Sequence, residues 1–322
     1  MKAIVVNEFG PPEVMGLDEV NEPAPTATEV LVRVHAIGVN PVETYIRGGK
    51  YPAVPPLPYT PGKDAAGVVE AIGDAVTRWK PGDRVYTAQS ISGTYAEYTL
   101  CEERDLGRLP ERVSFEQGAG IWTPYATSYR ALFQKAEATT GETVLIHGAS
   151  GGVGIAAVQW AKHAGLRVIG TASSDEGKKL VSDQGADLVC DHLSTPGGDA
   201  VEAISRFAGK GINVIIEMLA NVNLARDFDV LAMFGRICVV GNRGSLDFNP
   251  RLIMGKDATV KGMALYNSSY ADREEIHAAI YDGLIGGYLD PVVSRTFPLN
   301  EAPAAHHAVM ESKGFGKIVL VP

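Results

Sequence analysis

The sequence predicts an α/β protein in which a doubly wound parallel sheet is inserted into a β-rich domain. Two observations lead to this prediction. From about residue 140, apolar runs recur about every 20–25 residues, with helix-like segments between most of them. Before about residue 118, short strand-like runs occur without any strand–helix alternation. Because the apolar residues of the later runs are continuous rather than alternating, they indicate strands buried on both faces, as in a parallel sheet covered by helices.

The first part of the chain is predicted to be mainly β. Residues 29–40 alternate between apolar and polar like a strand, and residues 66–73 and 82–87 form short apolar runs. Residues 51–62 contain five prolines, so this segment is predicted to be a loop.

The second part carries the strands of the parallel sheet. Their number matches the Rossmann fold, and they are expected at residues 143–147, 166–171, 187–191, 213–218, 236–241 and 258–265. Between them, residues 154–165 form an alanine-rich helix, and Ser173-x-x-Glu176 reads as a capping box that opens the next helix.

The C-terminal segment is expected to return to the first domain. After about residue 265 come a helical stretch, a strand-like run, another helix and the final apolar run GKIVLVP. The predicted domains are therefore residues 1–120 plus 266–322 for the catalytic domain, and residues 121–265 for the Rossmann domain.

Composition excludes several classes of protein. The chain has 322 residues and a net charge of −9, without a basic block longer than Lys178-Lys179, which disfavours binding to a nucleic-acid backbone. Its three cysteines are far apart and form no C-x-x-C motif, which argues for a reducing compartment and against a structural zinc site. No apolar run approaches the roughly 18 residues of a membrane span, so the chain is expected to be cytoplasmic.

Residues 145–157, LIHGASGGVGIAA, fit two motifs. Gly148-x-Ser150-x-Gly152 matches the nucleophile elbow of α/β-hydrolases, with Asp282 or Asp290 and His306 or His307 as later triad partners. Read one residue later, the loop is close to the dinucleotide fingerprint G-x-G-x-x-G, with Ala149 in place of the first glycine. The strands that follow, and the lack of strand–helix units before residue 140, favour the dinucleotide interpretation.

The end of the second predicted strand favours NADPH over NAD. NAD sites place a carboxylate there to hold the ribose 2′-hydroxyl. This chain has Thr171, Ala172, Ser173 and Ser174 instead, followed by Lys178 in the next helix. Hydroxyl groups and a nearby ammonium suit the 2′-phosphate of NADPH, although Asp175 and Glu176 would oppose a phosphate if they pointed inward.

Eight segments together resemble the medium-chain dehydrogenase/reductase superfamily, and within it the zinc-free, zeta-crystallin-type NADPH:quinone oxidoreductases. They are VHAIGVNPVETYIRGGKYP, LPYTPGKDAAGVVEAIG, GDRVYT, SISGTYAEY, PYATSYRAL, HGASGGVG, IIEMLANVNL and VVGNRG. The resemblance extends over nearly the whole chain and implies a GroES-like catalytic domain around the Rossmann domain. It also implies an NADPH-dependent enzyme that transfers hydride or single electrons to a quinone.

The resemblance implies a set of site residues. Asn40, Tyr45 and Tyr51 would be catalytic, lining the nicotinamide and the substrate. The cofactor contacts that it implies are Asn40, Tyr45, Tyr125, Ser150, Gly151, Gly152, Val153, Ser173, Lys178, His192, Asn221, Val240, Gly241, Asn242 and Met263. Of these, residues 150–153 would hold the pyrophosphate, Ser173 and Lys178 the 2′-phosphate, and His192 the adenosine side.

No catalytic metal is expected. The zinc-dependent relatives carry a cysteine near Asn40-Pro41, a His-Glu pair at Lys63-Asp64 and a third ligand near residues 123–126. This chain has neither a thiol nor an imidazole at the first two positions, and no cysteine near the third.

Three further expectations stay open. The same fold also serves reductases of activated C=C bonds in enals and enones. Some relatives have a non-catalytic, crystallin-like or RNA-binding role, which the net charge of −9 disfavours here. By resemblance, the chain is expected to form a homodimer or homotetramer, with residues 258–265 able to pair across a two-fold axis.

Overall fold

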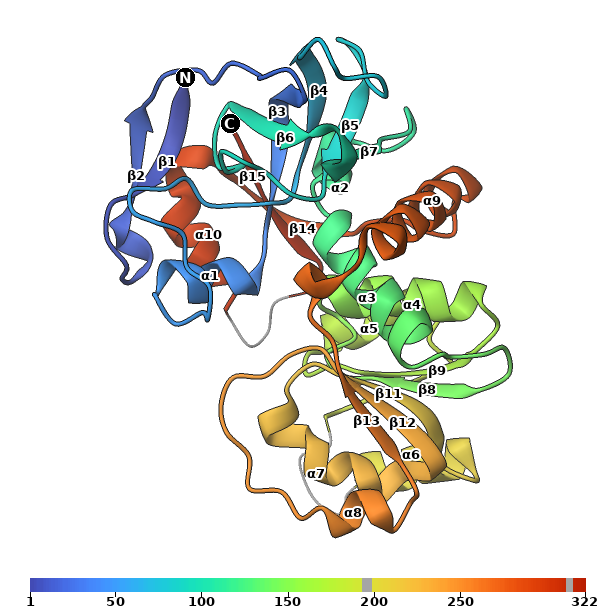
Figure 1. The fold of residues 1–322 in the computed structure, drawn as a ribbon. Helices are drawn as coiled ribbons and strands as arrows, with labels where there is room; N and C mark the ends of the chain where they lie inside the picture. Colours follow the sequence, from blue (N-terminus) through green and yellow to red (C-terminus); the bar gives the residue numbers. More distant parts are fainter. Residues whose placement is uncertain (193–198, 311–314) are drawn as a thin grey trace. The chain divides into compact units, whose positions relative to one another are not determined.

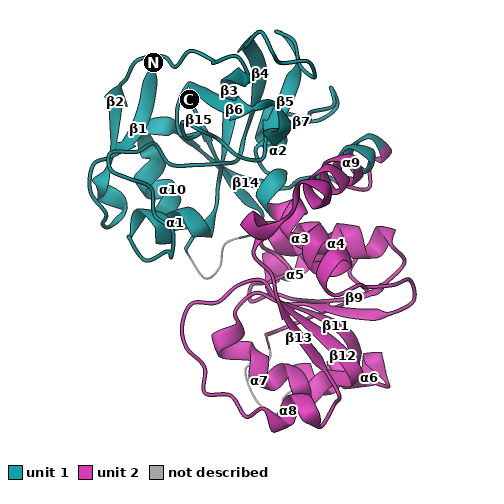
Figure 2. Cartoon of the chain, in the orientation of Figure 1, with its two compact units in different colours: residues 1–123, 281–285, 290–322 teal, residues 124–280, 286–289 magenta. Residues whose placement is uncertain are grey.

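The computed structural model describes residues 1–192, 199–310 and 315–322, and the chain divides into two compact units (Figure 2). Unit 1 comprises residues 1–123, 281–285 and 290–322, and unit 2 comprises residues 124–280 and 286–289. The chain thus leaves unit 1 and returns to it, as the sequence indicates for its C-terminal segment. The domain limits expected at residues 120 and 265 stay predictions, since compactness alone does not define a folding unit.

Unit 1 is mainly β, as expected. Its elements are β1 (Lys2–Val6), η1 (Pro12–Val14), β2 (Met15–Glu19), β3 (Glu29–Val39), α1 (Pro41–Arg47), β4 (Ala65–Ile72), β5 (Arg84–Thr87), β6 (Tyr98–Glu102), η2 (Glu103–Asp105), β7 (Leu106–Arg108), α2 (Phe115–Gly118), β14 (Val293–Pro298), η6 (Leu299–Glu301), α10 (Ala302–Ala308) and β15 (Lys317–Val321). The proline-rich segment 51–62 is a loop, as its composition predicts.

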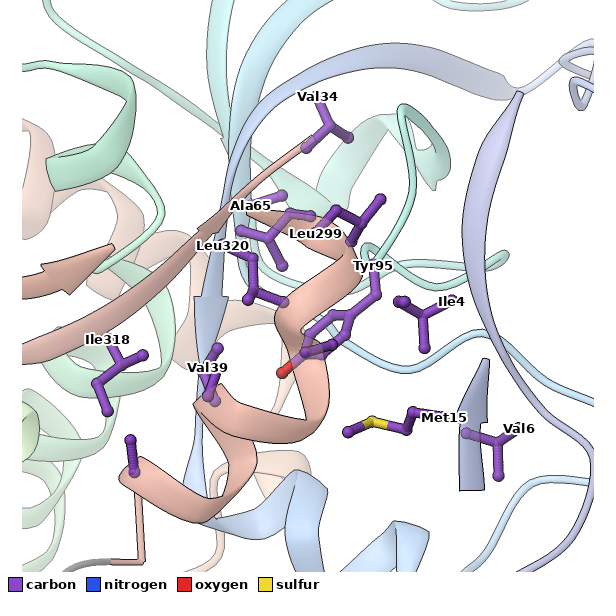
Figure 3. Packing of buried hydrophobic residues seen from close by; sticks show 14 residues of the cluster. Ile4, Val6, Met15, Val34, Val39, Ala65, Tyr95, Leu299, Ile318 and Leu320 are labelled. Atoms are coloured by element: carbon purple, nitrogen blue, oxygen red, sulfur yellow. The ribbon is translucent and has the colours of Figure 1, made fainter. Parts of the chain in front are cut away.

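The main sheet of unit 1 pairs strands of the first 110 residues with the last two strands of the chain, while β1 and β2 form a separate two-stranded sheet. Its strands follow the order β14-β15-β3-β4-β5-β7, with β6 also paired to β3, and β15 runs antiparallel to β3. Beside this sheet, α10 packs on a buried apolar cluster that includes Ile4, Val39 and Leu320 (Figure 3). Tyr95 also belongs to the cluster, and its hydroxyl lies within it, so that group needs a protein partner.

Unit 2 alternates strands and helices. Its elements are α3 (Thr127–Tyr129), η4 (Arg130–Lys135), β8 (Thr143–Ile146), α4 (Gly152–His163), β9 (Arg167–Thr171), α5 (Asp175–Asp183), β10 (Leu188–Cys190), α6 (Asp199–Ala208), β11 (Ile212–Glu217), α7 (Ala220–Val230), β12 (Leu231–Val239), α8 (Arg251–Met254), β13 (Thr259–Gly262) and η5 (Leu265–Asn267). Helix η3 (Trp122–Ala126) and helix α9 (Tyr270–Gly286) each contain residues of both units.

The strands of unit 2 form one parallel sheet, which confirms the predicted fold class. In the described part of the chain, all six expected strands are present, in the order β10-β9-β8-β11-β12-β13. Helices α4 and α5 cover one face of this sheet, and α6 and α7 cover the other (Figure 1). The strand order reverses between β8 and β11, and ligands bind such sheets outside the carboxyl ends of the strands at this reversal.

Within residues 1–192, 199–310 and 315–322, no helix is long and apolar enough to cross a bilayer.

Candidate cofactor site and buried polar networks

The loop between β8 and α4 begins the candidate cofactor site. Helix α4 begins at Gly152 with Gly151 as its N-cap, and its first helical hydrogen bond runs from the amide of Ile155 to the carbonyl of Gly151. The N–H groups of the first helical turn, at residues 152–154, therefore have no acceptor within the helix. Free N–H groups and the helix dipole make this end of α4 suited to bind a phosphate.

Gly154 packs the helix directly against the loop. A Cβ atom at this position would lie 2.4 Å from the carbonyl oxygen of Gly148 and 2.5 Å from Cα of Ala149. Both neighbours are backbone atoms, so neither can move aside as the end of a side chain would. Glycine is required here for close contact between helix and loop. The third glycine of the dinucleotide fingerprint has the same role.

Thr171, the last residue of β9, connects the loops that follow three neighbouring strands. Its hydroxyl accepts a hydrogen bond from the amide of Gly148, 3.1 Å away, and lies 2.9 Å from Nδ1 of His192. Its carbonyl accepts from the amide of Ala149 at 2.8 Å. His192 follows β10, so the expected adenosine-side residue lies at the same sheet edge as the glycine-rich loop. Thr171 is a site residue that the sequence motifs do not single out for this contact.

The start of α5 differs from the prediction by one residue. Ser174, not Ser173, caps the helix: its side chain accepts a hydrogen bond from the amide of Gly177, 3.0 Å away, and its backbone is extended. The predicted capping box Ser173-x-x-Glu176 is therefore wrong. Ser173 precedes the N-cap and is exposed.

The expected 2′-phosphate residues lie next to the glycine-rich loop. A Cβ at Gly177 would be 3.2 Å from Cβ of Ser150, which shows how closely the start of α5 approaches that loop. One turn into α5, the ammonium of Lys178 lies 2.8 Å from the carboxylate of Asp191. This hydrogen bond raises the pKa of Lys178, which therefore stays positively charged.

A second group of expected residues follows β11 and β12. The amide of Asn221 donates to Oδ1 of Asn242 at 3.1 Å, and Oδ1 of Asn221 accepts from the amide of Arg243 at 3.0 Å. The carbonyl of Gly241 accepts from Ala220 at 3.0 Å. Met263, just after β13, is buried. Because all these strands are parallel, this group and the glycine-rich loop share one edge of the sheet.

A buried cluster of three titratable side chains lies beneath this edge. Nε2 of His147 is 2.8 Å from Oδ1 of Asp227 and 3.5 Å from Oε2 of Glu217, and each residue is at most 1% exposed. Burial raises the pKa of both carboxyl groups to about 7 and lowers the pKa of His147. Among the described residues, no other group of three potential metal-ligating side chains is this close together.

The same cluster fixes the turn after β11. Oε1 of Glu217 accepts hydrogen bonds from the backbone amide of Leu219 and from Nδ2 of Asn223. The turn leads into Asn221, so the cluster holds the backbone beside one of the residues expected to contact the cofactor. The sequence motifs do not indicate it, because the three residues lie on separate elements.

Tyr125 and the two unit 1 tyrosines have different surroundings. Tyr125 is 2% exposed, and its hydroxyl donates to Oε1 of Gln159 at 2.8 Å inside unit 2. Tyr45 lies in α1 and Tyr51 in the loop beyond it, and both are half-buried. Their expected contacts with the nicotinamide and the substrate stay predictions.

Asn40 is the centre of a buried polar network in unit 1. Its Nδ2 donates to Asp64 at 3.0 Å and to Glu43 at 3.3 Å, and its Oδ1 accepts from the ammonium of Lys317 at 2.5 Å. Asp64 also accepts a hydrogen bond from the hydroxyl of Thr123 at 2.7 Å. The side chain of Asn40 thus has both amide hydrogens engaged, with one lone pair of Oδ1 remaining for a ligand.

This network occupies the positions compared above with those of the zinc-dependent relatives. Asn40, Asp64 and Thr123 do come together, but the group that lies among them is the ammonium of Lys317. Zinc sites in proteins are built from thiolate, imidazole and carboxylate ligands. A donor set with a single carboxylate and a buried positive charge does not fit a zinc ion.

The network continues through a directed chain of hydrogen bonds. Arg47 donates to Nδ1 of His306 at 3.2 Å, so the ring proton of neutral His306 is on Nε2, which faces the hydroxyl of Tyr95 at 3.0 Å. Tyr95 in turn donates to Oε2 of Glu43 at 2.8 Å. Burial raises the pKa of Glu43 to about 7.

These contacts argue against His306 as the base of a hydrolase triad. Both of its ring nitrogens are engaged, by Arg47 and Tyr95. The other candidates also have partners: exposed His307 lies 2.7 Å from the carboxylate of Glu13, and Asp290 accepts a hydrogen bond from Gln117 at 2.8 Å. The nucleophile-elbow interpretation of Ser150 thus gains no support from the structure.

His306 makes folding stability dependent on pH. Burial lowers its pKa from 6.5 to about 3, so its contribution is complete above pH 6.5 and is lost as the pH falls towards 3. At pH 5, about 1.5 pH units below the ordinary value, the loss is about 2 kcal/mol. We expect His306→Gln to be less stable than the parent protein at pH 7.5, with the gap smaller by about 2 kcal/mol at pH 5.

Urea denaturation of both proteins at the two pH values measures this difference. The raised pKa of Glu43 acts in the opposite direction, but Glu43 is present in both proteins and its contribution largely cancels. A gap that stays constant between pH 7.5 and pH 5 would show that His306 is protonated in the folded state.

Comparison with known proteins places the chain in a family. Residues 26–111 match the alcohol dehydrogenase GroES-like domain family, and residues 152–280 match the zinc-binding dehydrogenase family. The chain is 46% identical to quinone oxidoreductase from Homo sapiens over 324 aligned positions, covering 100% of this chain and 98% of that protein. It is 35% identical to quinone oxidoreductase from Pseudomonas aeruginosa, covering 100% and 99%.

A solved structure agrees with these matches. The crystal structure of Escherichia coli quinone oxidoreductase complexed with NADPH superposes with a TM-score of 0.91 at 30% identity, covering 100% of both chains. The similarity extends through both units and includes the elements that carry the candidate site. The chain therefore belongs to the medium-chain dehydrogenase/reductase superfamily and, within it, to the quinone oxidoreductases of the zeta-crystallin type.

Proposed function

We propose that this chain is an NADPH-dependent quinone oxidoreductase that works without a metal ion. The observation that supports this proposal is a helix start with free N–H groups, packed through Gly154, in a chain 46% identical over its full length to human quinone oxidoreductase. NADPH, when bound, supplies a hydride or single electrons. The protein holds the cofactor and the acceptor, orients them and excludes water.

The residues of unit 2 fit the phosphates of NADPH. Residues 150–153 would hold the pyrophosphate through backbone N–H groups at the start of α4. Ser173 and Lys178 would hold the 2′-phosphate, because no carboxylate stands at the end of β9 and Lys178 keeps its charge. To do so, the ammonium of Lys178 exchanges its Asp191 partner for phosphate.

The other contacts belong to the same proposal. His192 would approach the adenosine, and Asn221 the ribose beside the nicotinamide, with Val240, Gly241, Asn242 and Met263 along the strand ends. Asn40, Tyr45 and Tyr125 would contact the nicotinamide, and Tyr51 the quinone. A quinone is a strong electron acceptor whose product oxygens take protons from water, so positioning is the main demand on these side chains.

We also propose that the chain forms a homodimer or homotetramer. Strand β13 lies at the edge of its sheet, so its outer side offers unpaired backbone groups to a second copy. Tyr266, which follows β13, is 59% exposed. An exposed aromatic beside an open strand edge supports an interface at this place.

A direct assay tests the enzymatic proposal. We expect purified protein to oxidise NADPH in the presence of ortho- or para-quinones, and to use NADH at least about tenfold less efficiently, since NADH lacks the phosphate that Lys178 would pair with. Absorbance at the nicotinamide band measures the rate. Lys178→Ala should narrow the preference for NADPH over NADH, and Lys179→Ala, on the same helix, should not.

Two outcomes would contradict the proposal. If no quinone supports NADPH oxidation, the chain is not a quinone reductase. If alkenals are reduced far faster than every quinone, the enzyme is a reductase of activated C=C bonds.

A further inference from the structure

Lys317 is an unusual residue because its charged end is inside unit 1. It begins β15, is 5% exposed and carries its ammonium to within 2.5 Å of Oδ1 of Asn40 and 3.5 Å of Oδ2 of Asp64. Burial lowers the pKa of this lysine, while Asp64 and Glu43 raise it. Burying an ammonium without partners would cost a large amount of folding free energy. The charge of Lys317 and its hydrogen-bond partners therefore depend on one another.

Two glycines leave room for the lysine side chain. A Cβ at Gly38 in β3 would lie 2.9 Å from Cε of Lys317, and a Cβ at Gly120 would lie 3.3 Å from its Cγ. The Cβ at Gly38 would also lie 2.1 Å from the carbonyl oxygen of Ala119. The stem of Lys317 thus passes over positions where a side chain would displace it.

The surrounding charges determine the orientation of the Asn40 amide. An ammonium can only donate hydrogen bonds and an ionised carboxylate can only accept them. Oδ1 of Asn40 must therefore face Lys317, while Nδ2 faces Asp64 and Glu43. If the ammonium were absent, Oδ1 would lose its partner among these contacts, and the amide would be held only through the hydrogen bonds of Nδ2.

Asn40 in turn determines the start of α1. It is the N-cap of this helix, and its backbone amide donates to Oε2 of Glu43 at 2.9 Å in a capping box. Helix α1 also carries Tyr45. The side chain of Lys317, in the last strand of the chain, thus contacts the N-cap residue of the helix that carries Tyr45.

We propose that Lys317 is a positioning residue of the reductase: its buried ammonium orients the amide of Asn40 and holds the start of α1 in the form needed for reaction. The proposal rests on the proposed function, since Asn40 and Tyr45 are expected there to contact the nicotinamide. Lys317 itself acts through Asn40. A lysine with only a structural role would affect stability but not the orientation of this one amide.

The first experiment measures turnover of a quinone with Lys317→Met, which keeps the length of the stem and removes the charge. We expect kcat/KM for the quinone to fall at least about tenfold, the loss that goes with one charge-assisted hydrogen bond, with NADPH affinity changed less than about twofold. Lys256→Met in unit 2 is the matched control, because that ammonium also donates to the protein, to the carbonyl of Leu231 at 2.8 Å. It should leave kcat/KM unchanged.

Chemical rescue separates charge from packing. Lys317→Ala lacks the three carbons and the ammonium that propylammonium contains. Added propylammonium should restore part of kcat/KM, whereas 1-propanol of similar size should not. Equal effects of the amine and the alcohol, or no rescue by either, would argue against a role for the charge.

The second experiment does not depend on catalysis. In protein labelled with ¹⁵N-asparagine, we expect the side-chain amide hydrogens of Asn40, assigned with Asn40→Asp, to exchange slowly with water. In Lys317→Met they should exchange at least about tenfold faster, since the amide is then held through Nδ2 alone and opens more often. Equal exchange rates in the two proteins would overturn the proposal, even if the wild type proved not to reduce quinones.

A double variant covers the case in which Lys317→Met does not fold. Removing the ammonium leaves the buried carboxylate of Asp64 without its cation, which is itself destabilising. Asp64→Asn with Lys317→Met removes both charges, so this protein should fold. The fast exchange of the Asn40 amide should persist in it, and slow exchange there would count against the proposal.

Discussion

Replacing Gly154 with alanine is expected to lower the free energy of unfolding by about 3 kcal/mol and to abolish measurable NADPH binding. The reason is steric: the new methyl group would lie 2.4 Å from the carbonyl oxygen of Gly148, well inside contact distance. Helix α4 must then move away from the loop, which displaces the N–H groups of its first turn. Urea denaturation followed by circular dichroism measures the first effect, and NADPH fluorescence titration the second.

Gly16→Ala is the control for this prediction. Gly16 belongs to β2, and a Cβ there would meet only the carbonyl oxygen of Val5, at 3.9 Å. Since alanine is more favourable than glycine in a strand, this variant should be as stable as the parent protein or up to about 1 kcal/mol more stable. If the two variants unfold at the same urea concentration, the close contact at Gly154 does not exist in solution.

The sheet of unit 2 could be predicted because its strands are covered on both faces. Strands β8 and β11 carry the continuous apolar runs VLI and VII at their centres, and the distances between runs leave room for one helix each. The start of α5 was harder to place, since Ser173 and Ser174 both fit an N-cap locally. Their backbone conformation decides between them, and neighbouring serines do not reveal it from the sequence.

The buried polar networks could not be predicted in the same way. Lys317 and Asn40 are separated by 277 positions, and GKIVLVP looks like the beginning of an ordinary strand. His147 directly follows β8 and Asp227 lies in α7, so their contact depends on how helix and sheet pack. Residue type indicates that such groups need partners when buried, but only the fold shows which partners they find.

The observed hydrogen bonds also limit the roles that the residues of a motif can have. Ser150 has the spacing of a nucleophile, yet both nitrogens of His306 are engaged by Arg47 and Tyr95. Asn40 was expected to contact the cofactor, and its amide hydrogens are already donated to carboxylates. A ligand can therefore reach Asn40 through Oδ1 or through the backbone, which narrows its proposed role to accepting a hydrogen bond.

Gly151→Ala separates binding of the pyrophosphate from folding. A Cβ on Gly151 would lie 3.5 Å from the carbonyl oxygen of Gly148, an ordinary contact, so the unfolding free energy should change by less than about 0.5 kcal/mol. The methyl group would nevertheless stand at the N-cap of α4, beside the N–H groups proposed to hold the pyrophosphate. We expect the Kd for NADPH to rise about 100-fold, as the loss of two charge-assisted hydrogen bonds would produce.

Comparing the two glycine variants distinguishes a loss of stability from a loss of NADPH binding. Gly154→Ala should lose stability and binding together, whereas Gly151→Ala should lose binding alone, because only the ligand meets its methyl group. Calorimetric titration with NADPH and with 2′-phosphoadenosine, which lacks the pyrophosphate, locates the effect. Affinity for the fragment should stay within about twofold of the parent value, since its 2′-phosphate is proposed to bind at α5 and not at the start of α4. Unchanged NADPH affinity in Gly151→Ala would place the pyrophosphate elsewhere, and an equal loss for the fragment would mean that the substitution disturbs the whole sheet edge.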